Sequence, residues 1–117
     1  MPDMPKVMVA GIGGASLGTE ILKCLRKARR YQIYGCDISG YAYGHYEKGV
    51  TETFVVSRER YVECVLKLCV AKGIRVIIPG GDEPAVLLGS AAADFLPYCH
   101  KRSVQARPRH WSRTDAR

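Results

Sequence analysis

The chain has 117 residues, 47% of them hydrophobic and 25% charged, and a formal net charge of +7 at pH 7. This length and composition are typical of one globular domain, and they exclude a complete two-domain enzyme or a six-strand dinucleotide-binding fold with its own catalytic domain. No apolar run approaches the ~18 residues that a membrane span needs. The first residues do not resemble a signal peptide, so we expect a cytoplasmic protein without a membrane partner.

The positive charge is concentrated towards the carboxyl end of the chain. Residues 1–99 contain 12 Lys/Arg and 10 Asp/Glu, whereas residues 100–117 contain 6 Lys/Arg and one Asp. Arginines in the last segment can meet phosphates, and Trp111 can stack on a base. We favour the alternative that residues 100–117 are a disordered or non-native basic tail, because they contain too few apolar residues to offset the entropy of ordering. Nucleic acid is therefore not an expected partner.

The cysteines are odd in number and show neither a CxxC pair nor the Cys/His spacing of a zinc site. We interpret them as buried free thiols in a reducing compartment, and we predict no metal site. They are Cys24, Cys36, Cys64, Cys69 and Cys99.

The chain begins with a strand, a glycine turn and a helix. Lys6–Ala10 is a short apolar run typical of a buried parallel strand, and glycines follow it directly. From Ala15 the apolar residues recur at helical spacing, and basic residues gather at the predicted carboxyl end of this helix, where they suit its dipole. The predicted apolar face contains Leu17, Ile21, Leu22, Leu25 and Ala28.

Two more strands and a second helix follow. Gln32–Cys36 predicts a strand that delivers Asp37 at its end, and Glu52–Val56 has the β-branched and aromatic character of a third strand. The long segment between them is predicted to be irregular. Arg58–Lys72 then predicts a helix, with Ser57 as its N-cap and a glycine ending it.

The last predicted elements are a strand over Arg75–Ile78 and a helix over Ala85–Phe95. The alternation of strands and helices implies a parallel sheet with right-handed crossovers. We therefore predict an α/β fold, a small Rossmann-like three-layer sandwich with a four-stranded, mainly parallel sheet. This domain is expected to span residues 1–99.

The glycine turn after the first strand is the first candidate site. Gly11, Gly13 and Gly14 lie between a strand and a helix, where glycines let a ligand approach the backbone and the helix offers N–H groups to an anion. The dinucleotide fingerprint GxGxxG is not matched, because Ser16 takes the place of the third glycine and Gly18 comes two positions late. A tight turn in which Gly18 permits close packing of helix on sheet is an equally good interpretation.

Two acidic positions at strand ends are further candidates. Asp37 can bind ribose hydroxyls, as in nicotinamide enzymes, or it can accept local backbone hydrogen bonds. Gly80, Gly81, Asp82 and Glu83 follow the fourth strand, where open α/β sheets place their ligands. They can orient a substrate or a partner domain, and Asp82 or Glu83 can instead cap the last helix.

The segment Tyr41–Tyr46 carries three tyrosines and a histidine. Such a loop can line a pocket, but we favour tyrosines that fold over the edge of the sheet as packing. His45 has no second histidine, cysteine or serine at useful spacing. With no nucleophile–base pair in the chain, we predict no catalytic residue.

Together these motifs resemble the pre-ATP-grasp domain, the N-terminal domain of ATP-grasp ligases, and within them the carbamoyl-phosphate-synthetase-like group. The resemblance covers about residues 6–96. It is carried by four stretches, Val7–Gly18, Ile33–Ser39, Tyr61–Lys72 and Arg75–Glu83.

The resemblance implies a substrate-side domain rather than a catalytic one. In that family the full enzyme uses ATP and Mg²⁺ to activate a carboxylate as an acylphosphate, and the catalytic groups belong to the downstream ATP-grasp domain. We therefore expect a fragment that is inactive alone, with no cofactor of its own, whose partner is the parent's ATP-grasp domain. An apolar surface exposed where that domain packs would favour a homodimer. The alternative is a small Rossmann module that binds NAD(P) or another nucleotide.

Overall fold

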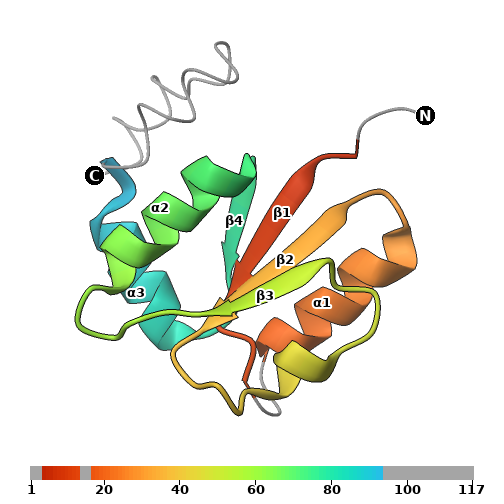
Figure 1. The fold of residues 1–117 in the computed structure, drawn as a ribbon, viewed down its shortest axis with the longest axis horizontal. Coiled ribbons are helices and arrows are strands. Elements are labelled where there is room, and N and C mark those ends of the chain that lie inside the picture. Colours follow the sequence, from red (N-terminus) through yellow and green to blue (C-terminus); the bar gives the residue numbers. More distant parts are fainter. Residues whose placement is uncertain (1–3, 14–16, 94–117) are drawn as a thin grey trace.

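The computed structural model describes residues 4–13 and 17–93, and the fold is that of these residues (Figure 1). Gly14, Cys99 and the basic tail lie outside them. The strands are β1 (Lys6–Ala10), β2 (Gln32–Asp37), β3 (Glu52–Val55) and β4 (Val76–Pro79). The helices are α1 (Leu17–Ala28), α2 (Tyr61–Lys72) and α3 (Asp82–Ser90), with a short 3₁₀ helix η1 (Tyr43–Tyr46).

The four strands form one sheet in the order β3-β2-β1-β4, and every neighbouring pair is parallel. In the centre, Val9 pairs with Gly35 of β2 on one side and with Ile78 of β4 on the other. The chain therefore moves outward from β1 in one direction through β2 and β3, and then returns to the other side of β1. This makes the gap between the carboxyl ends of β1 and β4 a topological switch point, the position where open α/β sheets bind ligands.

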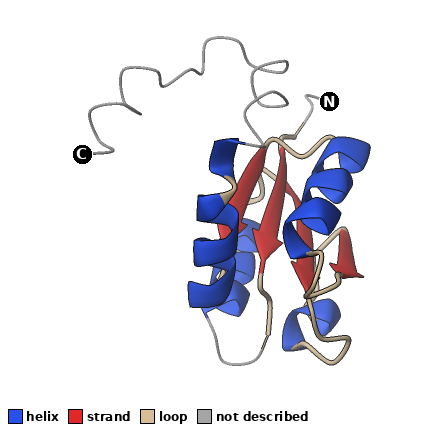
Figure 2. Cartoon of the chain, turned by 90° about the vertical axis from the view of Figure 1, so that its left-hand side faces the viewer, coloured by secondary structure: helices blue, strands red, loops and turns tan. Residues whose placement is uncertain are grey.

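Helices cover both faces of the sheet (Figure 2). Because successive side chains of a strand point to opposite faces of the sheet, Met8 and Ala10 of β1 lie in one core and Val9 lies in the other. The first core also holds Tyr61 and Val65 of α2, and the second holds Leu22 of α1. The predicted three-layer, Rossmann-like α/β sandwich is confirmed, and its sheet is parallel throughout.

The packed face of α1 differs from the prediction at both ends of the helix. Leu22 is buried, and Ile21 and Leu25 pack against the core as expected. Leu17, however, is 62% exposed, and Ala28 is exposed too. The buried residues of the first turn are instead Gly18 and Thr19, so its small residues rather than its leucine face inward.

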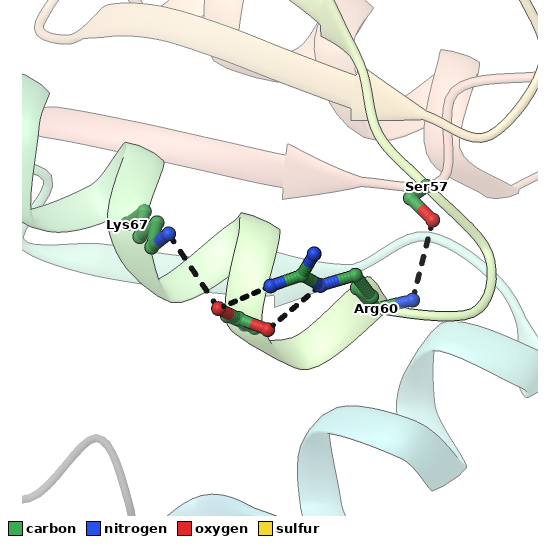
Figure 3. A network of polar contacts seen from close by, with 4 residues as sticks. Ser57, Arg60 and Lys67 are labelled. Atoms are coloured by element: carbon green, nitrogen blue, oxygen red, sulfur yellow. Dashed lines mark hydrogen bonds and ion pairs between the residues drawn. The ribbon is translucent and has the colours of Figure 1, made fainter.

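Helix α2 begins at Tyr61 rather than Arg58, and Ser57 is not its N-cap. The Ser57 hydroxyl accepts a hydrogen bond from the backbone N–H of Arg60 at 3.3 Å, which makes a separate turn before the helix (Figure 3). Exposed Glu63 bridges Arg60 and Lys67 along the first turns (Figure 3). The helix ends as predicted at Gly73, whose φ of 73° is left-handed.

The last strand and helix are shifted from their predicted bounds. Strand β4 includes Pro79, and the N–H of Gly80 donates to the carbonyl of Ala10 at 2.7 Å, continuing the contact with β1 that proline cannot make. Helix α3 begins at Asp82, after Gly81 as N-cap, with no side-chain hydrogen bond at the cap. The prediction that Asp82 or Glu83 caps this helix is therefore wrong, although both lie in its first turn. The predicted end at Phe95 lies outside the described residues.

The longest helices of the described residues have 12 residues each, and none of the helices there is long and apolar enough to cross a membrane.

Candidate functional site

Three glycines bring the β1–α1 and β4–α3 turns into direct backbone contact. The N–H of Gly18 donates to the carbonyl of Gly80 at 3.0 Å. A Cβ on Gly18 would overlap the carbonyl oxygen of Gly11, and a Cβ on Gly80 would lie 2.7 Å from the Cα of Gly18. Gly11 itself has a φ of +102°, which side chains rarely tolerate. These contacts agree with the interpretation in which Gly18 permits close packing at a tight turn.

A cleft of about 200 Å³ opens beside this junction, at the carboxyl ends of β1, β2 and β4. Six of the predicted site residues line it, whereas Asp82 does not and Gly14 lies outside the described residues. The six are Gly11, Gly13, Asp37, Gly80, Gly81 and Glu83. The structure therefore brings the three separate sequence motifs together in one place.

Asp37 is engaged by the backbone on both carboxylate oxygens. Oδ2 accepts the N–H of Ile12 at 2.8 Å, and Oδ1 accepts the N–H of Ser39 at 3.0 Å. Asp37 thus joins the turn after β1 to the turn after β2. The local hydrogen-bonding interpretation of this residue therefore describes its contacts.

Arg58 and Glu83 close one side of the cleft with an ion pair of 2.6 Å. The pair links the segment before α2 to the first turn of α3. Both side chains are more than half exposed, so the pair is worth little in stability but neutralises the Glu83 carboxylate. Sequence reasoning placed Arg58 in a helix and missed this contact, because nothing local relates it to a residue so far along the chain.

Tyr61 is the least expected residue of the cleft. Its side chain packs in the core and is only 5% exposed, yet its buried hydroxyl has no hydrogen-bond partner among the described residues. Burial raises the pKa of this phenol, and the neighbouring charges of Asp37 and Glu83 raise it further. The hydroxyl therefore stays protonated. From the sequence, the helical spacing of Tyr61 predicted only that its side chain packs in the core.

The tyrosine segment does not pack as predicted. Tyr41, Tyr43 and Tyr46 are 91%, 56% and 73% exposed. Gly44 and Ala42 are the buried residues, because the segment lies so close to Ile12 that a Cβ on Gly44 would come within 2.5 Å of its Cβ. None of the three tyrosines lines the cleft.

His45 has a structural role in this segment. Its Nε2 donates to the carbonyl of Ser39 at 2.9 Å, and its Nδ1 lies 2.8 Å from the Thr53 hydroxyl of β3. The ring thereby ties the segment to the edge of the sheet, and both ring nitrogens are used.

The cysteines of the described residues form no disulfide with one another, and they are not all buried. Cys36 and Cys69 are buried as predicted, Cys64 is only partly buried, and Cys24 is exposed, so the prediction of buried thiols is wrong for Cys24. Burial raises the pKa of Cys36 to about 12, which makes it a poor nucleophile. Among the described residues no group of three or more His, Cys, Asp or Glu side chains is placed to hold a metal ion.

The fold and the cleft define a small doubly wound α/β domain with a candidate ligand site at its topological switch point. Comparison with protein-family models, with curated proteins and with solved structures finds no match.

Proposed function

We propose that this chain is the N-terminal, substrate-side domain of an ATP-dependent ligase of the ATP-grasp type, in the carbamoyl-phosphate-synthetase-like group. The supporting observation is the convergence of the glycine turn, Asp37 and the Gly80–Glu83 segment around one cleft. These are the motifs on which the resemblance to the pre-ATP-grasp domain rests. ATP and Mg²⁺ would be used by the parent enzyme in the cytoplasm, on a separate catalytic domain.

The size of the cleft fits one wall of a larger site. Its volume of about 200 Å³ lies below the ~300–1,000 Å³ of complete small-molecule sites. Its lining contains backbone, apolar side chains, Tyr61, the Asp37 carboxylate and the Arg58–Glu83 ion pair, with no nucleophile–base pair. The role proposed for this domain is therefore to shape and orient a substrate that the catalytic domain activates, and the chain alone would be inactive.

The partner surface is proposed to include the β4 edge of the sheet. Val76 of β4 is 49% exposed and Val86 of α3 is 66% exposed. Within the described residues β4 pairs only with β1, so its other edge is open to a neighbour. The parent's ATP-grasp domain would cover this region, and without it two copies would associate there.

The gene's reading frame beyond the codon for Tyr98 tests the proposal most directly. Sequencing of the locus and its transcripts is expected to find an ATP-grasp domain encoded downstream, in frame or one base out of frame. Joining that domain to residues 1–98 is then expected to yield ATP hydrolysis that depends on a carboxylate substrate. A locus without ATP-grasp coding sequence in any frame would contradict the proposal.

A second candidate is a nucleotide-binding Rossmann module, favoured by the position of Asp37 at the end of β2 in a sheet of order β3-β2-β1-β4. Calorimetric titration with NAD⁺ and NADP⁺ separates the two candidates. Tight binding that Asp37→Ala abolishes would favour the nucleotide module. Absence of binding would leave the ligase domain as the better proposal.

A further inference from the structure

The net positive charge of the described residues lies in one segment, which is helix α1 and the turn after it. Residues 17–30 contain five Lys/Arg and one Glu, whereas the other described residues contain seven Lys/Arg and seven Asp/Glu. Nucleic acid was not expected from the sequence, because the basic character was attributed to residues 100–117. The domain that the structure describes nevertheless carries a basic surface of its own.

This surface is centred on four exposed cations that make no ion pair with any described residue. These four residues, which we call the basic patch, are Lys27, Arg29, Arg30 and Lys48. Lys48 lies near the last turn of α1, because its carbonyl accepts a hydrogen bond from the Arg26 guanidinium at 3.1 Å. The basic patch precedes β2 and therefore lies at the opposite end of the strands from the cleft.

Arg29 has a backbone conformation that favours glycine. Its φ is 54°, and among the described residues no other non-glycine residue has a positive φ. At the matching position after α2 the chain has Gly73, with a φ of 73°. Left-handed backbone is unfavourable for a residue with a Cβ, and Arg26 and Lys27 already place positive charge in the last turn of α1. Helix stability therefore does not explain an arginine here, whereas contact with an anion would.

Exposed tyrosines lie along the same helix. Tyr43 and Tyr46 of η1 are 56% and 73% exposed, and η1 lies beside α1 (Figure 1). After η1, the Glu47 carboxylate pairs with Arg26 at 3.4 Å, and a Cβ on Gly49 would lie 2.5 Å from the Cδ of Arg26. The segment between η1 and β3 is thus held against the last turn of α1. Aromatic rings and unpaired cations therefore share one side of the molecule.

We propose that this side of the protein binds single-stranded nucleic acid, with phosphates on the basic patch and bases stacked on Tyr43 and Tyr46. A basic surface with exposed aromatic rings is the arrangement by which proteins hold single strands without reading their sequence. An anionic bilayer fits less well, because the large exposed side chains beside the patch are tyrosines rather than the Leu, Phe or Trp that enter a membrane interface. The inference goes beyond the proposed function, which concerns the other end of the sheet.

Fluorescence anisotropy of a labelled oligo(dT) of about 12 nucleotides, titrated with the full chain, tests the proposal. We expect binding that weakens as sodium chloride rises from about 50 to 200 mM. A duplex of the same length should bind less tightly, because its bases are paired and cannot stack on tyrosine. No binding to oligo(dT), or equally tight binding to the duplex, would overturn the proposal. Binding to phosphatidylserine vesicles but not to oligo(dT) would overturn it in favour of a membrane.

Arg29→Gly separates binding from folding, because glycine suits the left-handed backbone at this position. The variant is expected to be at least as stable as wild type in urea. Its affinity for oligo(dT) should nevertheless fall about fivefold at 0.1 M salt, since one phosphate contact to a single strand contributes a salt slope of about 0.7. Lys67→Gln is the matched control, because it removes one charge from α2, whose core lies on the other face of the sheet. Equal affinity and slope in wild type and Arg29→Gly would place the strand elsewhere, such as on residues 100–117, and refute the inference.

Tyr46→Ala and Tyr46→Phe test the stacking of bases. Alanine removes the ring, so affinity for oligo(dT) is expected to fall about fivefold or more, whereas phenylalanine keeps a stacking surface and should bind as wild type does. Because Tyr46 is 73% exposed, neither variant should change the urea midpoint appreciably. Wild-type affinity in Tyr46→Ala, or equal losses in both variants, would contradict the proposal. These measurements use no ATP-grasp domain, so a negative result here is distinct from a locus that lacks one.

Discussion

Replacing Gly18 with alanine is expected to destabilise the protein, although alanine is the better helix residue. The new Cβ would overlap the Gly11 carbonyl oxygen and lie 2.9 Å from the carbon of that carbonyl, inside the 3.0 Å that real Cβ atoms respect. Backbone must then move, at a cost of about 1–3 kcal/mol or more. Loss of the Gly18–Gly80 hydrogen bond adds about 1 kcal/mol to this cost, and the higher helix propensity of alanine offsets about the same amount.

The net expected loss is about 1–3 kcal/mol, a large part of the ~5–15 kcal/mol that stabilises a small domain. Urea unfolding followed by circular dichroism at 222 nm measures it as a lower midpoint. Gly89→Ala is the matched control, because Gly89 also lies in a helix and nothing lies within 4 Å of its added Cβ. That variant should gain about 0.5–1 kcal/mol. Equal stabilisation in both variants would refute the close contact at the glycine junction.

Three further predictions follow from other parts of the structure. Asp37→Ala should lower the free energy of unfolding by about 2 kcal/mol in the same urea assay, since two backbone N–H groups lose a charged acceptor; an unchanged midpoint would contradict this role. Burial raises the pKa of Cys36 from 9.0 to about 12, so this thiol ionises first in the unfolded chain, and stability present below pH 9 should be lost as pH rises towards 12. Cys36→Ala should flatten that loss in unfolding curves recorded from pH 8 to 11, and a slope equal to that of wild type would contradict the assignment. Val76→Lys on the open β4 edge should shift light-scattering masses from dimer towards monomer, whereas a wild type that is monomeric at high concentration would contradict self-association.

Most elements of the fold could be predicted because their signals are local. The apolar run of Lys6–Ala10 and the glycine after Lys72 identify a strand and a helix end without reference to the rest of the chain. The starts of helices were less accurate. Helix α2 begins at Tyr61, later than predicted, because Ser57 forms a turn of its own. Helix α3 begins at Asp82, earlier than the predicted Ala85, with Gly81 rather than an acidic residue as its N-cap.

The predicted site residues converged where their strand ends meet, but their contacts could not be predicted. Asp37 had two equally good interpretations until its backbone partners at Ile12 and Ser39 were known. Tyrosines 41, 43 and 46 were expected to pack, and they are exposed because Gly44 and Ala42 take the space against Ile12. The fit of a segment against its neighbour decides such a question, and hydrophobicity alone does not.

The sequence by itself determined the fold class of this protein, the parallel sheet and the positions of its glycine turns, because periodicity and turn residues act over a few neighbouring positions. Only the tertiary structure decided which groups face the cleft. Arg58 is paired with Glu83, and the Tyr61 hydroxyl has no hydrogen-bond partner among the described residues, because crossovers bring α2 and α3 to the same face of the sheet. Such contacts depend on distances between segments far apart in the chain, which no local pattern records.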